Sequence, residues 1–168
     1  MTLITRRTLI ALGLSGIALP QTALAGPPRK ISWEDLIPAD VPYAQIVGEG
    51  FLDEVNDVWR PIYDSNARKM NEALDGVNIR MPGFVTPLEL TLMGVTTFIL
   101  VPSLGACIHT PPPPTNQMIL VTTDTPWPNK YLWEPIWVTG TLQIDIQTTS
   151  LAETGYIMAA DTIEVYEW

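Results

Sequence analysis

Apolar and polar residues alternate along much of the second half of the chain, which is typical of β-strands with one buried face. The clearest stretch is residues 136–146. One face there carries Ile136, Val138, Gly140, Leu142, Ile144 and Ile146, and the other carries Trp137, Thr139, Thr141, Gln143 and Asp145. Residues 77–81, 95–101, 117–123 and 156–166 are also β-prone. The pattern therefore predicts five or six strands, with a bend at Pro82-Gly83, a tight coil at Gly140 and a bulge near Ala160-Asp161.

Residues 49–74 have a different period. Phe51, Leu52, Val55, Val58 and Trp59 recur at helical spacing, and Ala67, Met70 and Leu74 continue it. This spacing predicts a helical segment, interrupted at Pro61 and stopped by Asp75-Gly76. Residues 26–48 are rich in proline and predict an extended or irregular leader.

The chain has 168 residues, with 16 prolines and 11 glycines, which suits one turn-rich domain. We expect a mainly β (α+β) fold over residues 49–168, helical at 49–74 and β-rich at 77–168. The strand number favours a small, partly open barrel of the OB type, and a β-sandwich is the alternative.

The first 25 residues have the features of an export signal. Arg6-Arg7 precedes an apolar run that is too short to span a bilayer, and Ala23-Leu24-Ala25 has the small-x-small pattern of a cleavage site. The paired arginines also fit a twin-arginine signal, although ordinary secretory signals share this feature. We expect cleavage near Ala25 and a periplasmic mature protein that does not span the membrane.

The formal net charge is −9, and it becomes −11 without Arg6 and Arg7. This charge argues against nucleic acid and anionic membrane surfaces as partners, and it suits cations or a basic protein surface.

The chain contains one cysteine and one histidine, two residues apart, at Cys107 and His109. If this stretch is extended, both side chains point to the same face. A lone thiol in an oxidising compartment is a liability unless it is buried, bound to metal or paired with another chain. Pro111 to Pro114 follow directly and stiffen the exit.

Thiolate and imidazole together favour zinc, with copper as the second choice. A closed zinc site needs about four ligands, so the remaining ones would come from carboxylates, water or a second protomer in a homodimer. The other candidate ligands are Met81, Met93, Met118, Glu89 and Asp124. The alternative for Cys107 is a small buried apolar residue.

The sequence contains little that resembles the motifs of known enzymes. Nothing in the chain matches a nucleophile elbow, a phosphate loop or a His-Glu-x-x-His helix, so we expect a protein that is not an enzyme. The alternative is a Cys-His nucleophile pair formed by Cys107 and His109. Trp127, Trp133 and Trp137, with Tyr131, predict either core packing or an aromatic platform for a sugar or a proline-rich peptide.

Several blocks of the mature chain also resemble one family of exported bacterial proteins, catalogued as domain of unknown function 3299. These blocks are residues 33–38, 81–89, 101–117, 135–142 and 155–167. The resemblance implies no established activity. It suggests proximity to ABC-type transport components in metal-responsive gene clusters, and it places the family's Cys-x-His pair on Cys107 and His109.

Two hypotheses follow for the function. The first is a periplasmic metal-binding or metal-handling accessory protein with Cys107 and His109 as ligands. The second is an adaptor domain without metal, which docks a transporter or another envelope protein through its acidic surface and its aromatic and proline-rich loops. A thiol sealed in apolar packing would favour the second.

Overall fold

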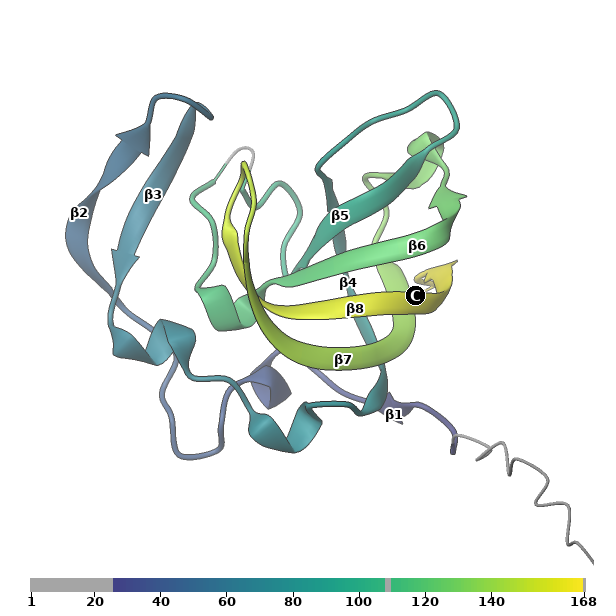
Figure 1. Ribbon diagram of the computed structural model, residues 1–168, viewed down its shortest axis with the longest axis horizontal. Coiled ribbons are helices and arrows are strands. Elements are labelled where there is room, and N and C mark those ends of the chain that lie inside the picture. The colour runs from purple at the N-terminus through teal and green to yellow at the C-terminus, as the bar shows by residue number, and fades with distance from the viewer. Residues whose placement is uncertain (1–25, 108–109, 168) are drawn as a thin grey trace, which may run out of the picture.

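The computed structural model describes residues 26–107 and 110–167, and this part of the chain is mostly β (Figure 1). The strands are β1 (Arg29–Lys30), β2 (Ile46–Asp53), β3 (Val58–Tyr63), β4 (Asn78–Pro87), β5 (Val95–Val101), β6 (Ile119–Trp127), β7 (Ile136–Thr148) and β8 (Glu153–Val165). The 3-10 turns are η1 (Glu34–Leu36), η2 (Ser65–Arg68), η3 (Glu72–Leu74), η4 (Thr115–Gln117) and η5 (Asn129–Tyr131).

Five strands form a small closed barrel in the order β4-β5-β6-β8-β7, and β7 pairs back onto β4. All pairings in the barrel are antiparallel except β6 with β8, which is parallel. This order, with one parallel pair between the third and fifth barrel strands, is that of an OB-type barrel. The predicted mainly β barrel is confirmed, and closure of the sheet excludes the sandwich alternative. Short β1 adds to the barrel beside β4.

β4 bends sharply in the middle, because its two halves pair with different neighbours. The pairing passes from β7 at Gly83, opposite Ile136, to β5 at Phe84, opposite Val101. A Cβ at position 83 would lie 2.8 Å from the Leu100 side chain, so only glycine allows this close crossing. The bend predicted at Pro82-Gly83 is therefore confirmed.

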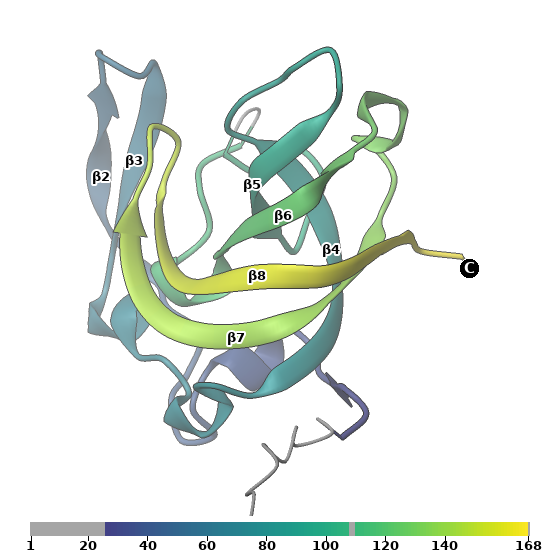
Figure 2. The ribbon, with the colours of Figure 1, turned by 45° about the vertical axis from the view of Figure 1, so that its right-hand side comes forward.

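β7 and β8 form a long curved hairpin that wraps one side of the barrel (Figure 2). Ile136, Val138 and Leu142 are buried, as the alternating pattern predicted, while Ile146 lies beyond the barrel and is exposed. A Cβ on Gly140 would lie 2.3 Å from the carbonyl oxygen of Ala159, so the strands meet closely there. The register shifts by one residue at Asp161, which confirms the predicted bulge.

The barrel encloses the main hydrophobic core. Its fully buried members come from every barrel strand and include Ile79, Met81, Phe98, Leu100, Ile119, Ile136, Leu142 and Tyr156. Burial of each large apolar side chain stabilises the fold by about 1.5–3 kcal/mol, so this cluster is the main source of stability.

The predicted helix over residues 49–74 is wrong. β2 and β3 form a separate antiparallel hairpin beside the barrel, followed by η2 and η3. Helical spacing misleads here because most apolar residues of the hairpin face solvent, so no core imposes a period of two. Gly48 and Gly50 oppose a helix, and Asn56-Asp57 forms the hairpin turn, with Asp57 at φ 54°.

The leader predicted at residues 26–48 ends at residue 45, because β2 begins at Ile46. Apart from β1 and η1 it is irregular, and it is packed onto the barrel. Leu36 is fully buried, and its carbonyl oxygen accepts a hydrogen bond from the Tyr156 hydroxyl at 2.6 Å. The same hydroxyl accepts from the backbone N–H of Asn71 at 2.7 Å. Burial raises the pKa of Tyr156 to about 12, so the hydroxyl keeps the proton that it donates. This one side chain joins the leader, the η3 region and the barrel.

Candidate functional site around Cys107

Cys107 lies in the loop between β5 and η4, not in a strand. Its backbone has φ 68°, a left-handed conformation that side chains other than glycine rarely adopt. Its N–H donates to the carbonyl oxygen of Thr110 at 3.1 Å, which closes a tight loop. Pleating therefore does not place the thiol beside the His109 imidazole, and His109 itself lies outside the described residues. The predicted Cys107–His109 ligand pair stays a prediction.

The thiol is sealed in apolar packing. Cys107 is 4% exposed and belongs to a second hydrophobic cluster with Ile99, Val101, Ala106, Met118 and Ala152. Burial raises the pKa of this thiol to about 12, and the positive charge of Arg60 opposes the shift only weakly. The sulfur is thus a neutral thiol at neutral pH, which weakens it as a nucleophile and as a metal ligand.

The nearest partner of the thiol is another sulfur. Cys107 Sγ lies 3.7 Å from Met118 Sδ, and both side chains are buried. The other candidate ligands lie elsewhere: Met81 is in the barrel core, whereas Met93, Glu89 and Asp124 are exposed. Within residues 26–107 and 110–167, no group of three or more His, Cys, Asp or Glu side chains is placed to hold a metal ion.

The proline segment after Cys107 connects the loop to the hairpin. The Tyr63 hydroxyl donates to the carbonyl oxygen of Pro112 at 3.0 Å. The segment then leads into η4, where the Asn116 side chain donates to the carbonyl oxygens of Asn66 and Lys69 at 2.9 Å each. The Cys107 loop therefore lies between the barrel and the hairpin and contacts both.

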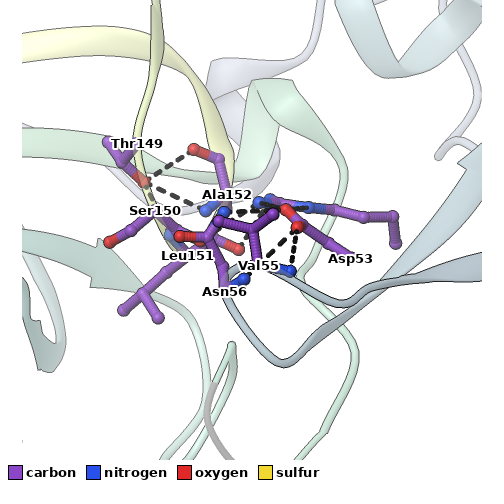
Figure 3. A network of polar contacts seen from close by, with 8 residues as sticks. Asp53, Val55, Asn56, Thr149, Ser150, Leu151 and Ala152 are labelled. Carbon is purple, nitrogen blue, oxygen red and sulfur yellow. Dashed lines mark hydrogen bonds and ion pairs between the residues drawn. The ribbon is translucent and has the colours of Figure 1, made fainter.

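A polar network attaches the hairpin to the barrel (Figure 3). Arg60 forms an ion pair with Asp53 across the hairpin, with the closest atoms 2.7 Å apart. The same guanidinium donates to the carbonyl oxygens of Ser150 and Leu151, in the turn between β7 and β8, at 3.0 and 2.9 Å. Hydrogen bonds from Asn56 and Arg60 lower the pKa of Asp53 to about 2, so the carboxylate is charged at neutral pH.

Two clefts flank Pro112, where these elements meet. The larger has a volume of about 440 Å³ and lies between the hairpin, η2, the proline segment and the start of β8. Its lining includes Phe51, Tyr63 and Met118. The smaller, of about 160 Å³, is lined by Cys107, Val58 and Trp59 among others. The two sulfur-bearing residues thus line neighbouring clefts.

The hairpin exposes many large apolar side chains, one of which, Phe51, lines the larger cleft. Its exposed large side chains are Ile46, Val47, Phe51, Leu52, Val55, Trp59 and Ile62. Glu49, Glu54 and Asp57 are exposed among them, while Arg60 is held by Asp53. The sequence pattern did not reveal these exposed residues, because Phe51, Leu52, Val55 and Trp59 recur at helical spacing.

The predicted aromatic cluster divides into separate groups. Trp127 packs against Tyr131 with ring centroids 5.6 Å apart, and Trp137 stacks on Tyr166 at 5.0 Å. Trp133 is 62% exposed. Residues 127–137 therefore do not form one continuous platform.

No helix in the described ranges has the length and hydrophobicity needed to cross a membrane.

Comparison with curated proteins gives no match. A crystal structure of a DUF3299 family protein from Pseudomonas aeruginosa PAO1 is similar, with 33% sequence identity and a TM-score of 0.68. The match covers 85% of this chain and 99% of that one. The family model for the protein of unknown function DUF3299 matches residues 33–165. The chain therefore belongs to the DUF3299 family.

Proposed function

We propose that this protein is an adaptor of the bacterial cell envelope, without catalytic activity, and that it binds a protein partner through the β2–β3 hairpin. The observation that carries the proposal is the concentration of exposed apolar side chains on a hairpin that the barrel holds in place. Exposed apolar patches rimmed by polar residues mark protein interaction sites.

The hairpin does not need these side chains for its own folding. Phe51, Leu52 and Val55 are 59%, 49% and 93% exposed, so they contribute little burial energy. An isolated two-stranded hairpin is marginally stable, and here Arg60 and Tyr63 fasten it to the barrel. A scaffold of this kind presents a preformed apolar surface, which reduces the entropy cost of binding.

Charge indicates the chemistry of the partner. The hairpin carries four acidic residues, Glu49, Asp53, Glu54 and Asp57, against Arg60 as its one basic residue. A second copy of this acidic chain would be repelled, whereas a partner surface with apolar residues and Lys or Arg at its rim would be complementary. Register shifts within β2 disturb its free edge and favour side-chain packing over addition of a partner strand.

Site-specific crosslinking and affinity measurement together test this proposal. A photoreactive residue at Val55 identifies the partner in cells, and one at Leu92, which is equally exposed on the β4–β5 loop, is the matched control. With the purified partner, the L52E/I62E variant is expected to bind at least about tenfold more weakly, because charges disrupt apolar packing at an interface centre. L92E is expected to bind normally. Equal binding by L52E/I62E and wild type, with both folded by circular dichroism, would contradict the proposal.

Export stays part of the proposal, with cleavage near Ala25. N-terminal sequencing of protein from the periplasmic fraction tests the cleavage site. The R6K/R7K variant is expected to stay in the cytoplasm if the twin-arginine route is used. Unchanged export would show the general secretory route.

A second candidate function, metal handling, is supported by the pair of sulfur atoms. Two sulfur ligands about 2.3 Å from one ion, at a tetrahedral angle, lie about 3.8 Å apart. The Cys107–Met118 separation of 3.7 Å is close to this value. A thioether is a soft ligand that favours copper(I), so the sulfur pair moves the proposal from zinc towards copper.

Metal must displace the thiol proton, and the raised pKa of Cys107 makes this costly, so the affinity is expected to rise with pH. Anaerobic copper(I) titration and elemental analysis of periplasmic protein test the site. C107S and M118L are each expected to lose the metal, whereas M93L retains it. Equal metal content in wild type and C107S would remove this candidate.

A further inference from the structure

The pairing that closes the barrel is incomplete between β6 and β8, because the C-terminal halves of these strands are unpaired with each other. The parallel ladder between these strands runs from Ile119, opposite Tyr156, to Thr122, opposite Ala159, and then stops. Both strands continue beyond this point, and Figures 1 and 2 show them running apart. The separation leaves a cleft of about 620 Å³ between residues 123–128 and residues 160–163, which we call the β6–β8 cleft.

The β6 side of this cleft is irregular. The ladder between β5 and β6 skips from Thr122 to Trp127, so residues 123–126 pair regularly with neither neighbouring strand. The Thr123 hydroxyl donates to the carbonyl oxygen of Thr125 at 3.1 Å, which closes the segment on itself. Backbone N–H and C=O groups that are not paired in a strand ladder, and that lie beside a cleft, are available to hydrogen-bond a ligand in that cleft.

The side chains that line the cleft combine hydroxyl groups, carboxylates and apolar surface. Thr123, Thr125 and Thr162 supply hydroxyls, and Asp124 and Asp161 supply carboxylates, although one oxygen of Asp161 already accepts from the Asn78 side chain at 3.1 Å. Apolar surface comes from Trp127, Ile163, Ala160 and two prolines, and no Lys, Arg or His lines the cleft. Two carboxylates without a cation repel phosphate groups and other anions.

One lining residue has an unsatisfied polar atom. Trp127 is only 8% exposed, and its indole Nε1 is buried without a hydrogen-bond partner among the described residues. The only other side-chain atom of this kind there is Asn116 Oδ1. A buried donor without an acceptor destabilises the fold by about 1–3 kcal/mol, so it needs an explanation. An acceptor atom of a ligand would satisfy it. The nitrogen is covered, so a ligand in the cleft reaches it only if part of the lining shifts, and residues 123–126 are the part of the lining that no ladder holds.

We propose that the β6–β8 cleft binds a neutral saccharide chain. Sugar hydroxyls both donate and accept, so they match this lining: they donate to the Asp124 and Asp161 carboxylates and accept from the Thr125 and Thr162 hydroxyls and the indole N–H. The apolar face of a sugar ring packs on Ile163 and the prolines. A cleft of 620 Å³ lies within the range of about 300–1,000 Å³ that is usual for small-ligand sites.

A cationic peptide is the main competitor for this cleft, since the two carboxylates would attract Lys and Arg. Ammonium and guanidinium groups only donate hydrogen bonds, so such a peptide could accept from the indole N–H only through its backbone carbonyl oxygens, whereas each sugar hydroxyl both donates and accepts. The saccharide satisfies both kinds of group. The cleft and the β2–β3 hairpin share no residue, so this proposal and the adaptor proposal succeed or fail independently.

Calorimetric titration of the mature protein with maltohexaose, cellohexaose and triacetylchitotriose tests the proposal, with a hexalysine peptide as the competitor. Saturable binding of at least one sugar is expected. D124N/D161N and W127F are each expected to weaken it about tenfold, through loss of charge-assisted hydrogen bonds and of the indole donor. D145N and W133F, which change an aspartate and a tryptophan outside the cleft, are the matched controls and are expected to bind normally.

Three outcomes would overturn the proposal. The first is no binding of any of the sugars at about 10 mM, where a site with a Kd of about 1 mM would be nine-tenths filled. The second is tight binding of hexalysine that excludes the sugar. The third is sugar binding that D124N/D161N leaves unchanged. If W127F does not fold, as judged by its circular dichroism and thermal unfolding, the surface double variant D124N/D161N decides the test.

Discussion

The barrel and the β2–β3 hairpin use similar residues in opposite ways. Phe98 in the barrel is fully buried, whereas Phe51 in the hairpin is 59% exposed. The barrel is held by five paired strands around one core, whereas the hairpin has only its own two-stranded ladder and the Asp53–Arg60 ion pair within it, and a few hydrogen bonds attach it to its neighbours. The difference shows that the barrel is the source of stability, and that apolar residues of the hairpin are available for another use.

The largest contrast is expected from one substitution made in each region. F98A removes a fully buried ring and is expected to lower the free energy of unfolding by about 3–5 kcal/mol. F51A removes an exposed ring and is expected to change it by about 0.5 kcal/mol or less. Urea unfolding followed by tryptophan fluorescence measures both. A similar loss in the two variants would show that the hairpin is part of the core.

A second pair of variants compares two tyrosine hydroxyl groups, that of Tyr156 in the barrel and that of Tyr63 in the hairpin. Y156F removes two hydrogen bonds, one to the buried carbonyl oxygen of Leu36 and one from the N–H of Asn71, and leaves only the direct 3.2 Å bond between these two groups, with an expected loss of about 1–3 kcal/mol. Y63F removes the one bond to Pro112 at the partly exposed hairpin, with an expected loss of about 0.5–1 kcal/mol. Thermal and urea unfolding of the two variants are the measurements. Equal losses would mean that the leader is held no more firmly than the hairpin.

The smallest expected effect is confined to the hairpin and depends on pH. The pKa of Asp53 falls from 3.8 to about 2 on folding, so its contribution is present above pH 4 and is lost as pH drops through about 2. Amide NMR shifts of β2 and β3 are expected to change in this window. D53N should loosen the hairpin above about pH 4, where the wild-type carboxylate is charged, and remove that response, whereas D145N on β7 should keep it. An unaltered titration in D53N would assign the response to another group.

The barrel strands could be predicted from the sequence, because burial of one strand face imposes an alternation of apolar and polar residues. Ile136, Val138 and Leu142 alternate with outward residues since one face of β7 meets the core, and Gly83 and Gly140 mark places where backbones come close. The hairpin could not be predicted in this way, because apolar and polar residues need not alternate along a strand pair that has no buried face. Its signals were local ones, Gly48, Gly50 and the Asn56-Asp57 turn.

The candidate sites depended on contacts that no local pattern reveals. Met118 was one of several possible sulfur ligands, and only the fold of the 102–117 segment places it beside Cys107. The side chains of Cys107 and His109 were expected to point to the same face only if this stretch were a β-strand. Pro102 and Gly105, in the preceding loop, are the residues that argued against a strand. The β6–β8 cleft arises where two strands distant in sequence pair in parallel and then separate. The alternation of residues along a single strand does not reveal which strand it pairs with or where that pairing ends.

The backbone of Cys107 has one further consequence, for saturation mutagenesis. A left-handed φ of 68° strains a residue with a Cβ by about 1–2 kcal/mol, and glycine is exempt. Glycine is therefore expected to rank level with or above alanine at this position, the reverse of the usual order at helix and strand sites. That ranking would report torsional relief alone, whatever ion or partner the thiol meets.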